Sequence, residues 1–164
     1  MKTLFITRHA KSSWEHPVLS DLERPVIENG VIKTRKIIDF FIQKKITVDM
    51  IMCSHATRAI ETAYLLADGF NYPREHIDIN PNLYECSEES LLNEVLALPN
   101  NKDNIIIIGH NPALTQFANF FLRQKIDFLP TSAVVSISFD TTQWEKILTC
   151  PERLNFMAFP KKLR

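Results

Sequence analysis

Cysteine and glycine are scarce in this sequence. It has only three of each, and the cysteines (Cys53, Cys86 and Cys150) include no Cys-x-x-Cys pair. An odd number of cysteines without paired spacing argues against a disulfide framework and against a zinc ribbon. We therefore expect free thiols and a cytoplasmic protein.

Long apolar segments are missing as well. No run approaches the ~20 residues that a membrane-spanning helix needs. Near the N-terminus only Leu4, Phe5 and Ile6 precede the polar residues Thr7 and Arg8, which is far shorter than the apolar core of a secretory signal. We expect neither a membrane segment nor a secretion signal.

The sequence has no excess of charge of either sign. Lys plus Arg and Asp plus Glu both number 19, so we expect neither nucleic acid nor a membrane surface as a partner. Any anion-binding site must then be local. The 164 residues are 45% hydrophobic and 23% charged, which suits one globular domain covering residues 1–164.

Apolar segments of strand length alternate with segments of helical period, and this alternation predicts an α/β fold. The expected strands are residues 2–7, 50–53, 76–80 and 105–108, followed by a strand at 133–139 with its hairpin partner at 144–149. Amphipathic helices are expected in the connections between the first four strands and after the fourth. This order implies a three-layer α/β/α sandwich whose sheet is mainly parallel and has an antiparallel edge.

Several residues mark the expected helix ends. Asn29-Gly30 is a turn signal before the first helix, and Ile42 completes its apolar stripe. Ser54 is the expected N-cap of the second helix and Gly69 its C′ residue. Asn111 is the expected N-cap of the fourth helix, with a proline at the first helical position.

Side chains suited to anion binding follow the predicted strands. Arg8 and His9 come directly after the first strand, Arg58 lies one helical turn beyond the second, Glu85 follows the third, and His110 follows the fourth. The carboxyl ends of parallel strands lie along one edge of a sheet, where α/β proteins bind ligands. We therefore expect a local, cationic and imidazole-rich site at that edge.

Arg58 is the most informative of these residues. It lies in the first turn of a predicted helix, where the macrodipole disfavours a cation by ~0.3–1 kcal/mol. An anion shared by the helix start and the guanidinium would offset this cost, and phosphate fits both groups. The alternative is a surface arginine paired with Glu61 or another carboxylate.

His9 and His110 each have a simple alternative, a structural histidine bonded to a backbone carbonyl. Their joint placement after buried strands, with arginines nearby, favours chemistry instead. A neutral imidazole is a competent nucleophile, and neighbouring arginines disfavour its protonation and neutralise phosphoryl oxygens. No metal is expected, because the sequence lacks His-x-x-x-His, Glu-x-x-His and Asp-x-His spacing and the arginines would repel a dication.

The ordered set of these motifs resembles the histidine phosphatase superfamily, and within it the SixA-type phosphohistidine phosphatases. The matching stretches are Arg8-His9-Ala10-Lys11-Ser12-Ser13-Trp14, Leu22-Glu23-Arg24-Pro25-Val26 with Asn29-Gly30, Thr57-Arg58-Ala59, Gly109-His110-Asn111-Pro112 and Thr131-Ser132-Ala133. Two positions depart from the pattern: Ala10 replaces a common glycine, and His55 stands where proline is frequent. The resemblance covers almost the whole chain and implies a phosphoglycerate mutase-like fold.

The resemblance also implies roles for individual residues. His9 would be the nucleophile that becomes phosphorylated, and His110 would complete the pocket. Arg8, Arg24 and Arg58 would hold phosphoryl oxygens. The set of candidates is completed by Glu85 as a general acid and Ser12 as a secondary phosphate contact. The alternative for Glu85 is a solvated carboxylate without a role in catalysis.

By the same resemblance the protein would be a phosphatase that needs no metal or cofactor and acts on phosphohistidine in a phosphotransfer or signalling protein. The short connections around the site predict a shallow, open pocket, which suits a phosphohistidine on a protein surface better than a small metabolite. Two alternatives remain: a small-molecule phosphomonoesterase of the same superfamily, and a phosphoprotein-binding module without activity.

Overall fold

A six-stranded mixed sheet forms the centre of the computed structural model, which describes residues 1–15 and 17–164. Its strands are β1 (Lys2–Arg8), β2 (Met50–Cys53), β3 (Asp78–Ile79), β4 (Asn104–Gly109), β5 (Val134–Phe139) and β6 (Glu152–Ala158). The strand order is β3-β2-β4-β1-β5-β6. The first four strands in this order are parallel, and β5 runs antiparallel to both β1 and β6. The predicted fold class is confirmed.

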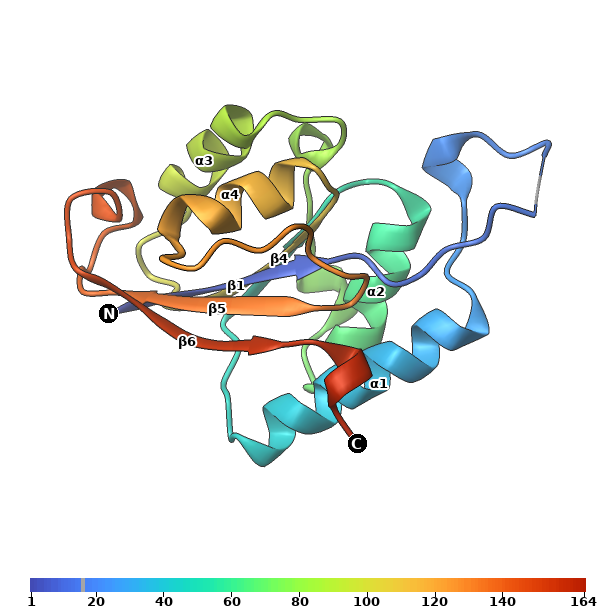
Figure 1. The fold of residues 1–164 in the computed structure, drawn as a ribbon, viewed down its shortest axis with the longest axis horizontal. Helices are drawn as coiled ribbons and strands as arrows, with labels where there is room; N and C mark the ends of the chain where they lie inside the picture. Colours follow the sequence, from blue (N-terminus) through green and yellow to red (C-terminus); the bar gives the residue numbers. More distant parts are fainter. Residues whose placement is uncertain (16) are drawn as a thin grey trace.

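Helices cover both faces of the sheet (Figure 1). The pair α1 (Glu28–Gln43) and α2 (Thr57–Gly69) lies on one face, and the pair α3 (Glu88–Leu96) and α4 (Ala113–Phe121) lies on the other. In the described part of the chain no helix is long and apolar enough to cross a membrane.

The core lies in two layers around the central strands. The four isoleucines of β4, residues 105–108, are fully buried and alternate between the two faces. Such a continuous β-branched run is typical of a parallel strand covered on both sides. The middle of the sheet is therefore packed on both faces, and its strands bring the residues at their carboxyl ends to one edge.

The helix ends differ from the sequence predictions in several details. Helix α1 begins at Glu28, so Asn29 and Gly30 belong to its first turn and form no preceding turn. Ile42 is 56% exposed and lies outside the buried stripe. Gly69 is the last residue of α2, where a β-carbon would come within 2.6 Å of the Ile38 side chain. Its role is close helix packing, and the C′ prediction was wrong.

Ser54 and Asn111, the two predicted N-caps, are not the N-cap residues of their helices, and both predictions were wrong. Ala56 is the N-cap of α2, and the Ser54 hydroxyl accepts a hydrogen bond from its N–H (3.2 Å). Pro112 is the N-cap of α4, and the Asn111 side-chain oxygen accepts bonds from the N–H (3.2 Å) and the hydroxyl (2.7 Å) of Thr115. Both polar side chains stabilise the approach to a helix.

The antiparallel partner of β5 is β6, and the prediction of a hairpin strand at 144–149 was wrong. Residues 144–146 form a 3₁₀ turn that buries Trp144. Most of β6 is exposed at the sheet edge, so its residues show no alternation of apolar and polar side chains. A strand without a buried face has no period-two signal.

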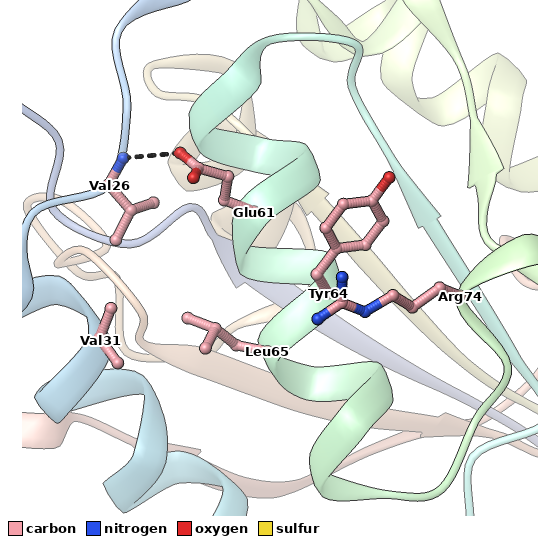
Figure 2. A pocket seen from close by; sticks show the side chains of 6 residues that line it. All are labelled: Val26, Val31, Glu61, Tyr64, Leu65 and Arg74. Carbon is pink, nitrogen blue, oxygen red and sulfur yellow. Dashed lines mark hydrogen bonds between the residues drawn. The ribbon is translucent and has the colours of Figure 1, made fainter.

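The polar residues 9–15 and 17–27 follow the carboxyl end of β1 and are bonded to other segments at several points. The N–H of Val26 donates to the Glu61 carboxylate of α2 (3.0 Å), which borders a cavity of about 260 Å³ (Figure 2). The N–H of Ile27 donates to the carbonyl of Lys11 (3.0 Å). Gly30 permits this packing, because a β-carbon there would come within 2.5 Å of the Lys11 carbonyl oxygen.

Candidate active site

The ends of β1 and β4 bring two histidines together. These strands are parallel neighbours, with Arg8 aligned to Gly109, so His9 and His110 leave the sheet side by side. Their ring centroids are 5.1 Å apart. This confirms that the two strands deliver both imidazoles to one edge of the sheet.

His9 is 6% exposed, and its ring has a defined orientation. Its Nδ1 lies 2.7 Å from the carbonyl oxygen of Ala10. A carbonyl only accepts, so Nδ1 carries the proton and Nε2 keeps its lone pair. The pKa of His9 is lowered to about 3, mainly by burial, with smaller contributions in the same direction from His110, Arg58 and Arg8 and an opposing one from the Ala10 bond. His9 is therefore a neutral imidazole with an available nucleophilic nitrogen.

His110 is neutral for similar reasons. Burial lowers its pKa to about 4, and the guanidinium of Arg58 acts in the same direction. Its Nε2 lies 2.6 Å from the Ser54 hydroxyl at the end of β2. Either of these atoms can be the donor. In the tautomer in which Ser54 donates, the proton of His110 is on Nδ1, which is buried and has no partner among the described residues, so this tautomer offers a donor to a ligand beside His9.

Arg58 enters from the first turn of α2 and is 5% exposed. Both of its terminal nitrogens bond to Asp21, NH1 to the backbone oxygen (2.6 Å) and NH2 to the carboxylate (3.0 Å). Glu61 instead accepts from Val26, so the carboxylate partner of Arg58 is Asp21 and not Glu61. The alternative of a carboxylate partner is thus realised, but at a buried arginine and not at a surface one.

Arg8 and Arg24 complete the cationic group. NH1 of Arg8 donates to the Leu129 carbonyl (3.2 Å), and both burial and the nearby Arg58 lower the pKa of Arg8. Arg24 is buried and bonds to the Asp21 carboxylate through Nε (3.1 Å) and to the Ser12 hydroxyl through NH1 (2.8 Å). Ser12 thus contacts Arg24, and its role as a secondary phosphate contact stays a prediction.

Unsatisfied polar atoms gather at this site. Of five buried side-chain nitrogens and oxygens without a partner in the described part of the chain, four belong to Arg8, His55, Arg58 and His110. A buried donor without a partner costs about 1–3 kcal/mol. Such a concentration is typical of a pocket whose hydrogen-bonding partner is a ligand, and a polyatomic anion suits donors on two arginines and a histidine.

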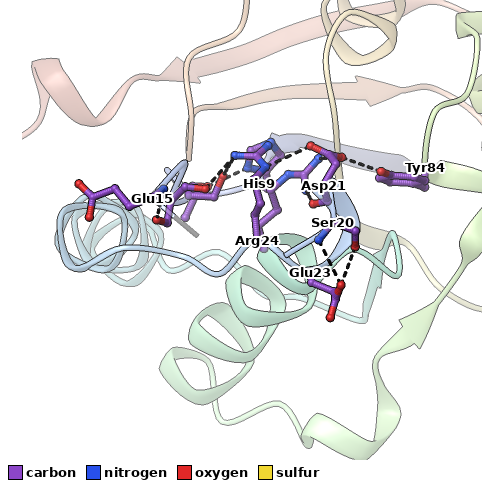
Figure 3. Close-up of polar contacts among 11 residues, drawn as sticks. His9, Glu15, Ser20, Asp21, Glu23, Arg24 and Tyr84 are labelled. Atoms are coloured by element: carbon purple, nitrogen blue, oxygen red, sulfur yellow. Dashed lines mark hydrogen bonds and ion pairs between the residues drawn. The ribbon is translucent and has the colours of Figure 1, made fainter. Parts of the chain in front are cut away.

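The sequence analysis missed Asp21. Its carboxylate accepts hydrogen bonds from Arg24, Arg58 and the Tyr84 hydroxyl, the last at 2.6 Å (Figure 3). These bonds lower the pKa of Asp21 to about 2, with the Tyr84 bond as the largest cause. The spacing of Asp21 three residues before Arg24 was a usable signal for part of this network.

Glu85, the predicted acid, lies on an exposed loop after β3 with a positive φ of 51°. Its side chain makes no hydrogen bond or ion pair with any residue in ranges 1–15 and 17–164. Its neighbour Tyr84 reaches the site instead and packs edge-on against His55 and His110, with centroid distances of 5.3 and 5.4 Å. The role of Glu85 as an acid stays a prediction that no contact supports.

Further residues surround the site. Ser132, at a positive φ of 62°, donates its N–H to the carbonyls of Arg8 (3.1 Å) and His9 (3.2 Å) and so holds the end of β1. Trp14 is 79% exposed and covers the Arg24 guanidinium at 3.5 Å. Burial raises the pKa of the Cys53 thiol to about 12, which makes it an unreactive core residue.

The arrangement is chemically suited to phosphoryl transfer. A neutral histidine offers a nucleophilic nitrogen, and three arginines beside it can neutralise the oxygens of a phosphoryl group. Among residues 1–15 and 17–164, no three His, Cys, Asp or Glu side chains gather as metal ligands. Together with the mixed α/β sheet, this site is that of an enzyme of phosphate chemistry.

Comparison with known proteins assigns the family. Residues 4–89, more than half of the chain, match the sequence profile of the histidine phosphatase superfamily (branch 1). The chain belongs to this superfamily. It is homologous to the phosphohistidine phosphatase SixA of Escherichia coli (strain K12), a hydrolase with which it shares 24% identity over 140 residues, covering 84% of this chain and 85% of the relative.

Solved structures show the same fold. A protein histidine phosphatase SixA complexed with tungstate superposes with a TM-score of 0.82 at 23% identity and covers 99% of each chain. A protein from Agrobacterium tumefaciens described as a phosphohistidine phosphatase SixA gives a TM-score of 0.80 at 21% identity, covering 96% of this chain and 97% of the other.

Proposed function

We propose that this chain removes the phosphoryl group from phosphohistidine on a partner protein, through a phosphorylated His9. The observation that carries the proposal is the orientation of His9. Its Nδ1 is engaged by Ala10 (2.7 Å), so Nε2 is free beside Arg8, Arg58 and His110. A neutral, fixed imidazole next to guanidinium groups is suited to attack on phosphorus.

The reaction proceeds in two displacements. In the first, the Nε2 lone pair of His9 forms a bond to phosphorus while the bond from phosphorus to the substrate imidazole breaks; the substrate ring reacts with its other nitrogen protonated, so it leaves with the electron pair as a neutral imidazole. In the second, water attacks phosphorus and the bond to His9 breaks with its electron pair returning to Nε2, while a water proton stays on the released inorganic phosphate or passes to solvent, which leaves neutral His9. The arginines compensate the charge on the phosphoryl oxygens in both steps, which is the main requirement of phosphoryl transfer.

The absence of a contact between Glu85 and the histidines supports a phosphoramidate substrate. An alkoxide leaving group needs a proton from an acid, whereas an imidazole leaves with less assistance. In the described part of the chain no carboxyl group with a raised pKa lies at the site: the pKa of Asp21 is about 2, so Asp21 is ionised and has no proton to give. Phosphohistidine fits these groups better than a phosphate ester.

Relatives and composition support three further parts of the proposal: the class of substrate, the independence from metal ions and the cytoplasmic location. The E. coli relative is named a phosphohistidine phosphatase, and a similar fold was solved with tungstate, a tetrahedral oxyanion like phosphate. The arginines supply the positive charge that a metal ion supplies elsewhere, so the reaction is proposed to be metal-independent. The three free cysteines suit a cytoplasmic location.

The test is the His9→Ala variant. The parent protein, incubated with a phosphohistidine-bearing phosphotransfer protein and quenched in alkali, should carry acid-labile phosphate and release inorganic phosphate. His9→Ala should do neither, while His76→Ala, which removes an exposed histidine, should behave as the parent. A His9→Ala variant that still hydrolyses the substrate would refute the proposal, and a parent that binds phosphohistidine without becoming labelled would favour a binding module.

A further inference from the structure

Asp21 is the only described residue whose side chain joins two of the arginines at the site. Its carboxylate accepts from Nε of Arg24 (3.1 Å) and from NH2 of Arg58 (3.0 Å), and its backbone oxygen accepts from NH1 of Arg58 (2.6 Å). The hydroxyl of Tyr84 donates to the same carboxylate (2.6 Å). Three segments far apart in sequence are thus connected through one residue (Figure 3).

The bonds to Asp21 determine which edge of Arg58 is free. A guanidinium has one Nε–H and two terminal nitrogens in a rigid plane. Asp21 engages one N–H on each terminal nitrogen, so Nε is the nitrogen of Arg58 that has no partner among the described residues, and it is buried. The Nε–H of Arg8 is likewise buried and without a partner in the described part of the chain, and a terminal nitrogen of Arg8 donates to the Leu129 carbonyl (3.2 Å). Both Nε donors are thus oriented by bonds that exist before any phosphoryl group binds.

We propose that Asp21 is a positioning residue, which orients Arg24 and Arg58 so that they meet a phosphoryl group in a preformed arrangement. The carboxylate touches the arginines and not the reacting atoms, so it acts through them. Without this acceptor two long cationic side chains next to Arg8 would repel each other and lose their common orientation. Preorganisation of this kind lowers the cost of binding.

The charge of Asp21 makes the proposal testable, because charge and positioning have opposite effects. Asp21→Asn removes a negative charge beside an anion site, which by electrostatics alone would strengthen binding of phosphate. It also removes strong charge-assisted bonds to both arginines, which on the positioning hypothesis weakens binding. The direction of the change in phosphate affinity therefore separates the two roles.

The probe is inorganic phosphate, with its dissociation constant measured by calorimetry for the parent, Asp21→Asn and a control. The control is Asp68→Asn, the same substitution at an exposed carboxylate paired with Arg74 (2.5 Å). We expect about tenfold or greater weakening for Asp21→Asn, as lost charge-assisted bonds to two arginines imply, and no change for Asp68→Asn. Unchanged or tighter binding by a folded Asp21→Asn would overturn the proposal.

A second variant covers the case in which Asp21→Asn does not fold. Tyr84→Phe removes one hydrogen bond to Asp21 and keeps both arginine pairs, and it should weaken phosphate binding by about threefold. Unchanged affinity in Tyr84→Phe would then overturn the proposal. Hydrolysis of phosphoimidazole adds a second readout: Asp21→Asn should raise KM more than it lowers kcat. Phosphate binding requires no turnover, so this test remains valid even if the proposed phosphohistidine activity fails.

Discussion

The hydroxyl oxygen of Thr62 lies 2.8 Å from the backbone nitrogen of Ala10, from which it accepts a hydrogen bond. The same hydroxyl donates to the carbonyl oxygen of Arg58 (2.7 Å). Thr62 is fully buried, so no water can replace either bond. One side chain therefore couples the residue after the proposed nucleophile to the first turn of α2.

Thr62→Val should separate these two segments at nearly constant volume. The Ala10 N–H would be left buried without an acceptor, which costs about 1–3 kcal/mol of the free energy of unfolding, and kcat should fall because His9 loses its fixed position. Urea denaturation and hydrolysis of phosphoimidazole measure both effects. Thr149→Val, at an exposed threonine with a local bond to Lys146, is the control, and equal losses in the two variants would contradict the explanation.

Gly30→Ala should damage both stability and activity. A β-carbon there would lie 2.5 Å from the carbonyl oxygen of Lys11 and 3.0 Å from the backbone nitrogen of Lys11. Because both are backbone atoms, the clash can be relieved only if the chain around Lys11 is displaced. Overpacking costs about 1–3 kcal/mol, and the displaced segment contains His9. At Gly109 a β-carbon would meet Leu114 at an ordinary 3.7 Å. Gly109→Ala should change the free energy of unfolding by less than about 1 kcal/mol, and the reverse order of the two variants would refute this explanation.

Stability should fall in mildly acidic solution. The pKa values of His9 and His110 are lowered to about 3 and about 4, so between these values and about 6.5 the unfolded chain binds protons that the folded chain does not. The free energy of unfolding then decreases as pH is lowered from about 6.5 toward 4, by up to about 1.4 kcal/mol per pH unit for each histidine. Ionised Asp21, with a pKa of about 2, adds a loss only below its ordinary value of 3.8.

Urea denaturation across this pH range measures that slope. His9→Gln should make it shallower, because one titrating group with a lowered pKa is gone. His76→Gln, at an exposed histidine, should leave the slope as in the parent. A parent protein whose stability does not change between about pH 6.5 and about pH 4 would show that the histidines are not held neutral by the fold.

Glu85→Gln should distinguish the two kinds of substrate. Because Glu85 is exposed, we expect hydrolysis of phosphoimidazole to be unchanged in the variant. Any hydrolysis of phosphate esters should fall, since an alkoxide needs a proton to leave. Glu88→Gln, in the first turn of α3, is a matched control. Equal losses on both substrates would mean that Glu85 reaches the reaction centre and would favour the phosphomonoesterase alternative.

Removal of metal ions should have no effect. The positive charge at the site comes from Arg8, Arg24 and Arg58, so a Lewis acid is not needed to neutralise phosphoryl oxygens. Dialysis against EDTA followed by assay in the chelator should leave the rate of phosphoimidazole hydrolysis unchanged. A large loss of activity that added zinc or magnesium restores would contradict the proposed mechanism.

The convergence of the histidines and arginines was predictable because each follows a strand with a clear signature. Four successive isoleucines identify β4, and the carboxyl ends of parallel strands must share an edge. Asp21 was not predictable in the same way. It lies in a polar segment without periodicity, and its partner Tyr84 is 63 residues away, so only tertiary structure brings the two together.

Errors in the fold prediction have a common physical origin. Strand β6 lies exposed at the sheet edge, and the apolar Ile42 faces solvent. In both places hydrophobicity no longer reports which face is buried. Likewise, Gly69 resembles a helix terminator in sequence, but its missing side chain accommodates Ile38 of the neighbouring helix. Periodic patterns reveal elements that bury one face and fail where neighbours decide the packing.

The two tryptophans of the chain lie in opposite surroundings. The Trp144 indole is buried and donates to the Lys102 carbonyl (2.9 Å), whereas Trp14 is exposed above the guanidinium of Arg24. An exposed indole emits at longer wavelength than a buried one and is accessible to soluble quenchers. The native chain therefore carries an indole stacked on Arg24, one of the guanidinium groups proposed to hold a phosphoryl group, and we expect its fluorescence to report occupancy of that group without any added label.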